Sequence, residues 1–439
     1  MSSFDRLIDD TSLADTLVAV EQRLASLEPR LIPLFRECFP NTLTTTVQLL
    51  EDGTTFVITG DIPAMWLRDS SAQVRPYCAL AAENSTIRKM LAGLIRRQAF
   101  YILTDPYANA FNPQPNGNGH STDRTHMSPW VWERKFELDS LCYPVRLCWD
   151  YWTATGDRTL FDDTLRQMFR RIIDTMRTEQ HHDNRSEYRF ERDDVLLPSD
   201  TLPFGGTGTR TNFTGMVWSG FRPSDDACKF GYHLPDNMFA SIILDHIAEL
   251  AELIYQDVEL AQDARQLKAE IDFGIQTYGI VDHPRFGKIY AYETDGFGNY
   301  NLMDDANVPS LLSLPYLGYC APDDPLYLRT RAFVLSDENP NHHSGRYASG
   351  VGSPHTPGNY VWHLGLIMQG LTATDSAEQR DVIDMILATT AGTNLMHEGF
   401  DPDAPERYTR PWFAWANSLF SEFVMQWVEQ QGSNNESSG

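Results

Sequence analysis

The stretch LFDDTLRQMFRRIIDTM, residues 160–176, contains the pattern that decides the fold class. Its apolar side chains Leu165, Phe169 and Ile172 follow one another at steps of four and three residues, and Leu160 and Met176 continue the series. Residues with this spacing share one face of an α-helix, whereas the polar residues between them lie on the other face. The stretch therefore predicts an amphipathic helix that buries one side.

The same helical spacing recurs along most of the remaining chain. It predicts about a dozen helices, and Asn84, Asp157 and Asp375 are placed to cap three of them, Asp375 with Glu378 at capping-box spacing. The segments concerned include residues 13–27, 87–102, 141–148, 236–255, 257–278, 305–318, 323–335, 360–373, 376–391 and 412–430. We expect an all-α fold.

Strand signals are confined mainly to residues 279–300. There, the run GKIYAYETDGFGNY alternates β-forming with other residues and contains turn glycines near its end. We interpret this segment as a small β excursion and not as a second domain. Residues 1–430 are expected to form a single domain, and the polar, glycine-containing tail 431–439 is expected to fray.

Long connections separate many of the expected helices. They cover residues 104–134, 181–234, 279–304, 338–359 and 394–411. Loops of this length tend to carry function on a rigid scaffold. Six inner and six outer helices closed into a ring, the α/α toroid, would accommodate such loops around a pocket at one end. A helical solenoid would give the same periodicity, and no fixed repeat separates the two arrangements.

The charge of the chain excludes several classes of partner. Asp and Glu number 60 against 35 Lys and Arg, a formal net charge of −25. This charge repels phosphate backbones and anionic lipids, so neither nucleic acid nor a membrane is an expected partner. No stretch approaches the ~18 apolar residues of a membrane span, and the start, MSSFDRLIDDTSLADTL, lacks the segments of a signal peptide. We therefore expect a cytoplasmic protein.

Signals for metals and cofactors are weak. The six cysteines form no CxxC pair, so reduced thiols are expected instead of a zinc site or disulfide framework. The pairs His181-His182 and His342-His343 lack the spacing of zinc ligands, and Asp304-Asp305 lacks a spaced calcium loop. The run Gly205-Gly206-Thr207-Gly208-Thr209 resembles a phosphate loop only in glycine content. We expect no metal, no cofactor and no protein partner.

Tryptophans beside polar residues point to a sugar. Neutral sugars present hydroxyls and apolar C–H faces, which proteins bind with aromatic platforms and hydrogen-bonding side chains. For a single tryptophan, a core position between helices is an equal alternative, whereas several such pairs favour a carbohydrate pocket. The pairs are Trp66 with Arg68 and Asp69, Trp132 with Glu133, Trp218 with Arg222, Trp362 with His363, and Arg410 with Trp412 and Trp415.

Two loop segments hold candidate catalytic acids. Glycoside hydrolysis requires two carboxyl groups, one that protonates the leaving oxygen and one that activates water or attacks the sugar. The run Ser219-Gly220-Phe221-Arg222-Pro223-Ser224-Asp225-Asp226 supplies two aspartates shortly before an expected helix, which one of them can also simply cap. The run Asn394-Leu395-Met396-His397-Glu398-Gly399-Phe400 supplies an isolated glutamate.

Five separated motifs resemble those of one known family. They are Thr59-Gly60-Asp61-Ile62-Pro63-Ala64-Met65-Trp66-Leu67-Arg68-Asp69-Ser70, Gly215-Met216-Val217-Trp218 leading into the aspartate run, Asn307-Val308-Pro309-Ser310-Leu311, Met396-His397-Glu398-Gly399-Phe400, and Pro411-Trp412-Phe413-Ala414-Trp415-Ala416-Asn417. In this order they closely resemble glycoside hydrolase family 125, whose members are exo-α-1,6-mannosidases built on a six-fold α/α toroid. The resemblance extends over nearly the whole chain.

The resemblance implies a mechanism and a set of site residues. Asp225, with Asp226 as the alternative, would be the general acid, and Glu398 the general base of an inverting reaction, in which water needs a carboxyl separation of roughly 6.5–9.5 Å. The substrate would be a mannose-containing oligosaccharide or N-glycan fragment with a terminal α-1,6-linked mannose. Arg68 and Asp69 would bind mannose hydroxyls, unless they form only a structural ion pair. The full expected substrate-binding set is Trp66, Arg68, Asp69, Arg222, Asp226, Asn307, His363 and Trp415.

Two other functions remain open at this level. A sugar epimerase can use the same toroid, but its proton transfers would call for His363 and His397 to face the substrate. A catalytically inactive carbohydrate-binding protein is the other alternative, although both candidate carboxylates are present.

Overall fold

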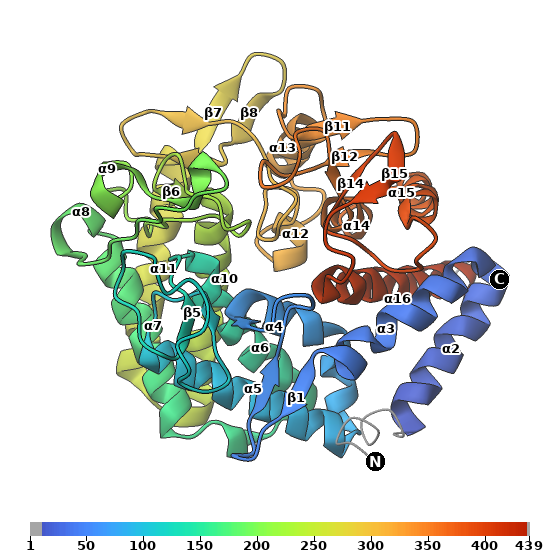
Figure 1. The fold of residues 1–439 in the computed structure, drawn as a ribbon, viewed down its shortest axis with the longest axis horizontal. Helices are drawn as coiled ribbons and strands as arrows, with labels where there is room; N and C mark the ends of the chain where they lie inside the picture. The colour runs from blue at the N-terminus through green and yellow to red at the C-terminus, as the bar shows by residue number, and fades with distance from the viewer. Residues whose placement is uncertain (1–10, 437–439) are drawn as a thin grey trace.

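The computed structural model describes residues 11–436 (Figure 1). Fifteen α-helices lie within this range, together with short 3₁₀ turns and one π-helical turn, Ala251–Tyr255. The helices are α2 Thr11–Leu27, α3 Ile32–Thr45, α4 Leu67–Val74, α5 Ser85–Thr104, α6 Leu138–Thr155, α7 Asp163–Glu179, α8 His182–Arg185, α9 Pro203–Gly206, α10 Leu234–Leu250, α11 Val258–Tyr278, α12 Leu314–Leu317, α13 Pro325–Val334, α14 His363–Leu371, α15 Ser376–Thr389 and α16 Ala414–Glu436. The predicted helix-rich character is confirmed.

Helix α7 matches the expectation from residues 160–176. Leu165, Phe169 and Ile172 are fully buried, as the spacing of three and four residues requires. The Asp162 side chain accepts hydrogen bonds from the first free amides and so begins the helix. Asp157 also acts as a cap, but of a preceding 3₁₀ turn, Arg158–Leu160. The helical prediction is confirmed, with its start moved by a few residues.

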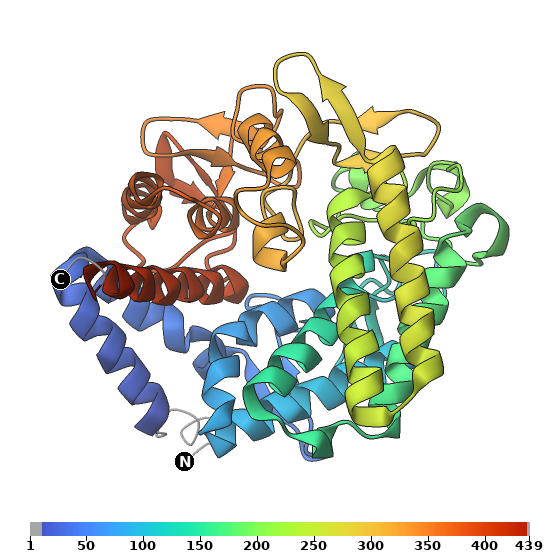
Figure 2. The same cartoon turned by 180° about the vertical axis from the view of Figure 1, so that it is seen from behind.

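The helices close on themselves. The C-terminal helix α16 packs against α3 and α4 near the start of the chain as well as against α14, and α6 packs between α4 and α10. Figures 1 and 2 show the helices arranged around the centre of the molecule from both sides. An open solenoid would keep its first and last helices apart. The packing of α16 therefore excludes the solenoid alternative.

One predicted helix is mostly absent. Within residues 305–318, only α12 is helical. The buried Asp304 carboxylate accepts hydrogen bonds from the backbone amides of Leu311 and Leu312 at 2.8 and 2.9 Å, and Pro309 has no amide to donate. Because these amides bind a side chain and not helical carbonyls, residues 305–313 form an irregular loop.

Short strands are more widespread than predicted. The described residues contain fifteen strands in six small sheets, so the restriction of strands mainly to residues 279–300 is wrong. Strands of two to five residues are too short to show alternation in the sequence. They are β1 Val47–Leu49, β2 Thr55–Val57, β3 Met65–Trp66, β4 Ala110–Phe111, β5 Val131–Glu133, β6 Tyr232–His233, β7 Ile280–His283, β8 Gly287–Tyr290, β9 Glu293–Thr294, β10 Tyr300–Asn301, β11 His342–Ser344, β12 Ser349–Val351, β13 Val361–Trp362, β14 Gly399–Asp401 and β15 Ala404–Tyr408.

Three of the sheets share one design. Strands β3, β6 and β13 each run directly into a helix, α4, α10 and α14 respectively. Each of these strands pairs with strands from a later loop, giving the sheets β3-β4-β5, β10-β9-β6 and β13-β14-β15. The small sheets thereby fix long loops at the N-terminal ends of three helices.

Other expectations concern the surface and the ends of the chain. All six cysteines are free thiols, and only Cys320 is more than marginally exposed, as predicted. Among the described residues, no helix combines the length and apolarity that a bilayer crossing requires. Helix α16 continues to Glu436, into the segment expected to fray, and residues 437–439 of that tail lie outside the described residues.

Candidate active site

A small cavity of about 150 Å³ gathers residues from the five family-like motifs. Its lining consists of Thr59, Ile62, Trp66, Arg68, Asp69, Ser224, Asp225, Asn307, His355, Trp362, Glu398, Arg410, Phe413 and Trp415. A larger, more open hollow of about 550 Å³ near Arg75 and Glu422 contains neither predicted catalytic carboxylate. The smaller cavity is therefore the candidate active site.

A tight turn over residues 222–226 directs the side chains of the two adjacent aspartates to different places. The backbone amide of Arg222 donates to the Asp226 carbonyl at 2.8 Å, and that of Asp225 to the Arg222 carbonyl at 2.9 Å. Asp225 adopts a left-handed conformation with φ of 65°, which is uncommon for a residue other than glycine and often occurs at functional sites. As a result, Asp225 lines the cavity whereas Asp226 is fully buried beside it.

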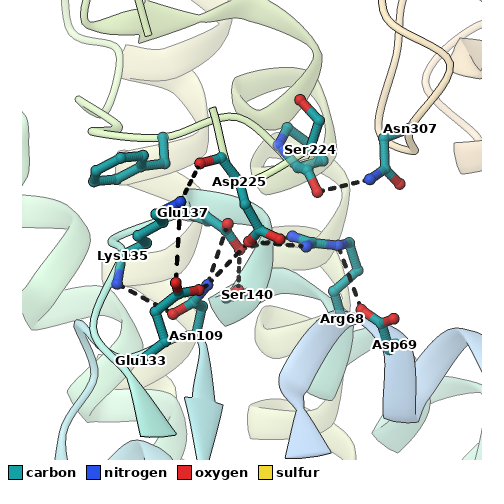
Figure 3. Close-up of polar contacts among 12 residues, drawn as sticks. Arg68, Asp69, Asn109, Glu133, Lys135, Glu137, Ser140, Ser224, Asp225 and Asn307 are labelled. Carbon is teal, nitrogen blue, oxygen red and sulfur yellow. Dashed lines mark hydrogen bonds and ion pairs between the residues drawn. The ribbon is translucent and has the colours of Figure 1, made fainter. Parts of the chain in front are cut away.

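The Asp225 carboxylate belongs to a buried polar network (Figure 3). The Asn109 side-chain amide donates both to Asp225 Oδ1 at 3.2 Å and to Glu137 Oε1 at 3.3 Å. Arg68 Nη1 donates to Glu137 Oε2 at 2.7 Å, and Arg68 Nη2 lies 3.7 Å from Asp225 Oδ1. Lys135 Nζ donates to the backbone carbonyl of Asp225 at 2.7 Å. The network fixes the position of Asp225 from three sides.

The protonation states within this network differ. Burial and the neighbouring Asp225 raise the pKa of Glu137 well above its usual value, although Arg68 opposes the effect. Burial also acts to raise the pKa of Asp225, but the hydrogen bond with Glu137 and the charges of Arg68 and Lys135 outweigh it and lower that pKa. The pKa values of the two neighbouring carboxyls are therefore shifted in opposite directions, upward for Glu137 and downward for Asp225.

Glu398 lies in a simpler environment. It directly precedes β14, and its Oε1 is 3.6 Å from Arg410 Nη1. Arg410 is itself held by Asp61, through Nη2 to Oδ1 at 2.6 Å, and its guanidinium lies 4.4 Å from the ring centre of Phe413. A cation anchored by Asp61 therefore faces the Glu398 carboxylate.

Most of the predicted substrate-binding residues line the cavity. Trp66 and Trp415 supply aromatic faces, and Arg68 is both a cavity residue and the centre of the ion-pair network. Burial raises the pKa of Asp69 to about 6 against the opposing charges of Arg68 and Arg410. Asn307 lines the cavity while its side-chain amide donates to the Pro223 carbonyl at 2.8 Å.

Three predicted substrate-binding residues do not line the cavity. The Arg222 guanidinium is turned to Glu293, with Nε donating to Oε1 at 2.6 Å. Asp226 Oδ1 accepts from the Ser199 hydroxyl at 2.7 Å and lies 3.4 Å from His355 Nδ1. The fully buried His363 accepts the backbone amide of His397 at 2.9 Å. Each of these three side chains is engaged by other protein groups, and its contact with substrate stays a prediction.

Several site residues were not predicted as such. Arg410 was named only as the polar neighbour of Trp412 and Trp415, and Phe413 only as a member of the Pro411–Asn417 motif. His355 also lines the cavity. Burial acts to lower its pKa, but the hydrogen bond with Asp226 and the charge of Asp226 outweigh burial and raise the pKa to about 9. Asn109 and Glu137 carry no sequence signal, since their role arises only from contacts with Asp225 and Arg68.

Within residues 11–436, no group of three or more His, Cys, Asp or Glu side chains is arranged to hold a metal ion. The cavity instead supplies carboxylates, cations and aromatic rings, a donor set that suits a neutral sugar.

Comparisons with known proteins agree with this chemistry. The family model described as metal-independent α-mannosidase (GH125) matches residues 28–425. A metal-independent α-mannosidase from Streptococcus pneumoniae, solved as a non-productive complex with α-1,6-mannobiose, is 45% identical with a TM-score of 0.93, covering 96% of this chain and 99% of that chain. The meiotically up-regulated gene 157 protein of Schizosaccharomyces pombe is 38% identical over 447 residues, covering 97% of this chain and 87% of that protein. A bacterial glucoamylase complexed with acarbose shares only the fold, at 13% identity and a TM-score of 0.54, over 91% of this chain and 55% of that chain.

Proposed function

The chain belongs to the metal-independent α-mannosidases of glycoside hydrolase family 125, and we propose that it is an inverting exo-α-1,6-mannosidase. The observation that carries the proposal is the presence of Asp225 and Glu398 in one small cavity, in contrasting polar surroundings. Its substrate is a mannose-containing oligosaccharide or N-glycan fragment with a terminal α-1,6-linked mannose. The scaffold is proposed to be a six-fold α/α toroid.

The size of the cavity supports removal of single terminal sugars. Its volume of about 150 Å³ is below the ~300–1,000 Å³ of pockets for drug-sized ligands. Such a space suits one sugar ring, with the rest of the oligosaccharide extending outward. The preference for the α-1,6 linkage is supported by the S. pneumoniae relative, which was captured with α-1,6-mannobiose.

The proposed reaction uses the two carboxyl groups in opposite senses. Asp225 gives a proton to the glycosidic oxygen as the bond to the anomeric carbon breaks, and the bonding electrons leave with that oxygen. Glu398 takes a proton from a water molecule whose oxygen attacks the anomeric carbon from the opposite face. The product is β-mannose. Inversion requires room for that water, hence a carboxyl separation of roughly 6.5–9.5 Å.

Neighbouring side chains are placed to bind the sugar in position for this reaction. Asp69 and Arg68 offer an acceptor and a donor for mannose hydroxyls, and the two together favour one hydroxyl arrangement. Trp66, Trp415 and Phe413 supply apolar surface for the C–H groups of the ring.

The positions of two histidines weigh against the epimerase alternative. His363 is buried and bonded to the His397 backbone. The His397 ring stacks on Tyr408 at 3.7 Å and its Nε2 lies 3.1 Å from the Thr393 hydroxyl. Neither histidine lines the cavity, so the proton transfer that an epimerase would assign to them has no geometric support.

A linkage panel tests the proposed function. The purified protein is incubated with α-1,2-, α-1,3- and α-1,6-mannobiose, and with an α-1,6-linked mannotrioside whose non-reducing end is methylated at the 6-hydroxyl. We expect free mannose from α-1,6-mannobiose alone and none from the blocked trioside. Release of a disaccharide from the blocked substrate would overturn exo action, and binding of sugar without any release would favour the inactive carbohydrate-binding alternative.

A further inference from the structure

Glu137 does not line the cavity, yet it lies directly behind the proposed acid. Its side chain is fully buried at the start of α6. It shares the Asn109 amide with Asp225, and Arg68 reaches both carboxyls, through Nη1 at 2.7 Å from Glu137 and through Nη2 at 3.7 Å from Asp225. Figure 3 shows Glu137 and Asp225 side by side, with Arg68 reaching both. A buried carboxyl in this position is not explained by sugar binding.

The charges around the pair create a conflict for an acid catalyst. Asp225 must carry a proton to act, but Arg68 and Lys135 both favour its ionised form. A second buried carboxyl next to it opposes their effect, because two adjacent carboxylates cannot easily both be ionised. Several titratable groups face the pair or its immediate partners. They are Arg68 and Asp69 of α4, Asp139 of α6, Glu133 and Lys135 before α6, Asp200, His355, Cys228, His233 before α10 and Asp236 of α10.

The neighbours of Glu137 can also stabilise its carboxylate once the proton has left. Arg68 Nη1 donates to Oε2 at 2.7 Å and the Ser140 hydroxyl donates to the same oxygen at 3.1 Å. The Asn109 amide donates to Oε1 at 3.3 Å. Three donors directed at one carboxyl favour its charged form. Glu137 is thus equipped to be neutral while Asp225 is charged and charged while Asp225 is neutral.

We propose that Glu137 is a positioning residue that stores the proton which Asp225 delivers to the glycosidic oxygen. The O–H bond of Glu137 breaks as a carboxyl oxygen of Asp225 takes the proton, leaving the Glu137 anion on Arg68, Ser140 and Asn109. The O–H bond of Asp225 then breaks as the proton bonds to the glycosidic oxygen, which keeps the electron pair of the broken C–O bond. A proton from solvent restores the pair after product release. This inference rests on the proposed hydrolysis.

The test compares substrates that differ in their need for an acid. Glu137→Gln retains the size of the side chain, can still accept from Arg68 and can donate to Asp225, but it holds no transferable proton. With α-1,6-mannobiose, whose leaving group requires protonation, we expect kcat/KM to fall about 10²-fold, within the range for lost general acid catalysis. With dinitrophenyl α-mannoside, whose leaving group departs unprotonated, we expect a fall of less than about 5-fold.

The pH profile supplies a second readout. Without the neighbouring carboxyl, Asp225 loses its proton more readily beside Arg68 and Lys135. The alkaline limb of kcat/KM for mannobiose is therefore expected to move by about one unit or more toward lower pH in Glu137→Gln. Equal losses on both substrates, or an unmoved alkaline limb, would overturn the proposal and leave Glu137 a purely structural role.

A matched control and a rescue variant complete the design. Asp139 also accepts from Arg68 Nη1, at 3.1 Å, but does not share the Asn109 amide with Asp225. Asp139→Asn is expected to lower both activities by the same factor. Glu137→Asp retains an acid and should keep the wild-type ratio between the two substrates, a result that is informative even if Glu137→Gln fails to fold. Wild-type protein that releases mannose from neither substrate would reject the proposed function itself, whereas an altered ratio in Glu137→Asp would count against the proton store.

Discussion

The two sides of the cavity surround their carboxylates in different ways. Asp225 belongs to a crowded network in which Asn109, Arg68 and the buried Glu137 all contact it or one another. Glu398 lies 3.6 Å from Arg410, which is tied to Asp61 on its other side. The difference teaches that two carboxyl groups in one cavity can have surroundings that suit opposite proposed roles, acid and base. A second buried carboxyl adjoins the proposed acid on one side, and an anchored cation faces the proposed base on the other.

Replacement of the proposed base, Glu398, tests this contrast and is expected to have the largest effect on kcat. Glu398→Gln is expected to lower kcat by about 10³–10⁴-fold on both α-1,6-mannobiose and dinitrophenyl α-mannoside, because each needs an activated water. Stopped and continuous assays of mannose release measure the loss. The exposed Glu406 of strand β15 supplies the control, and Glu406→Gln should remain fully active. A loss confined to mannobiose would contradict the assignment of Glu398 as base.

Removal of the acid is expected to give the opposite dependence on substrate. Asp225→Asn should lose about 10²–10⁴-fold on α-1,6-mannobiose but less than about 10-fold on dinitrophenyl α-mannoside. Asp226→Asn is the matched variant, since Asp226 lies outside the cavity and contacts Ser199 and His355. It should show a smaller loss that is the same for both substrates. The reverse result would make Asp226 the acid.

Arg410, which faces the proposed base Glu398, provides a third test. Arg410→Lys keeps the charge but cannot hold Asp61 with a planar fork and face Glu398 at the same time. A displaced base is expected to cost about 10²-fold in kcat, the scale of a 1 Å misplacement. KM for mannobiose should change less than kcat. An unchanged kcat would show that Arg410 does not position Glu398.

The motifs that identify the family also contain most of the cavity wall, which is why much of the site could be predicted. Trp66, Arg68, Asp69, Asp225 and Glu398 all lie in segments with a distinctive local sequence. The helices were predictable for a similar reason, since a buried face requires apolar residues at steps of three and four. Both kinds of signal are local.

The unpredicted features depend on partners that are distant in sequence. Arg68 and Glu137 are 69 positions apart, and Asp61 and Arg410 are 349 apart. No local pattern reveals such pairs. The same reason applies to Arg222, which was expected to bind sugar and whose guanidinium donates to Glu293 of a later strand. Residues 305–313 have helical spacing, yet Asp304 takes two of their amides.

The smallest expected effect concerns His355, which joins the acid side of the cavity to the buried Asp226. Its pKa of about 9 lies above the ordinary value of 6.5, because the contribution of Asp226 exceeds the cost of burial. The raised value means that His355 stabilises the folded protein fully below about pH 6.5 and that this contribution is lost as the pH rises through 9.

Urea unfolding of wild type and His355→Gln checks this prediction. At pH 6 the variant should be less stable by about 1–2 kcal/mol, as for a hydrogen bond to a charged group. At pH 9.5 the two proteins should differ little. A stability difference that stays constant between these pH values would show that His355 is not charged in the folded protein.

The stereochemistry of the released sugar tests the contrast between the two carboxylates most directly. Proton NMR follows the anomer that appears from α-1,6-mannobiose before mutarotation, with the α-1,2 and α-1,3 isomers as controls. If Asp225 is the acid and Glu398 activates water, β-mannose appears first, and from the α-1,6 substrate alone. If α-mannose appears first, the configuration is retained, Glu398 does not activate an inverting water, and the account of the two sides is contradicted.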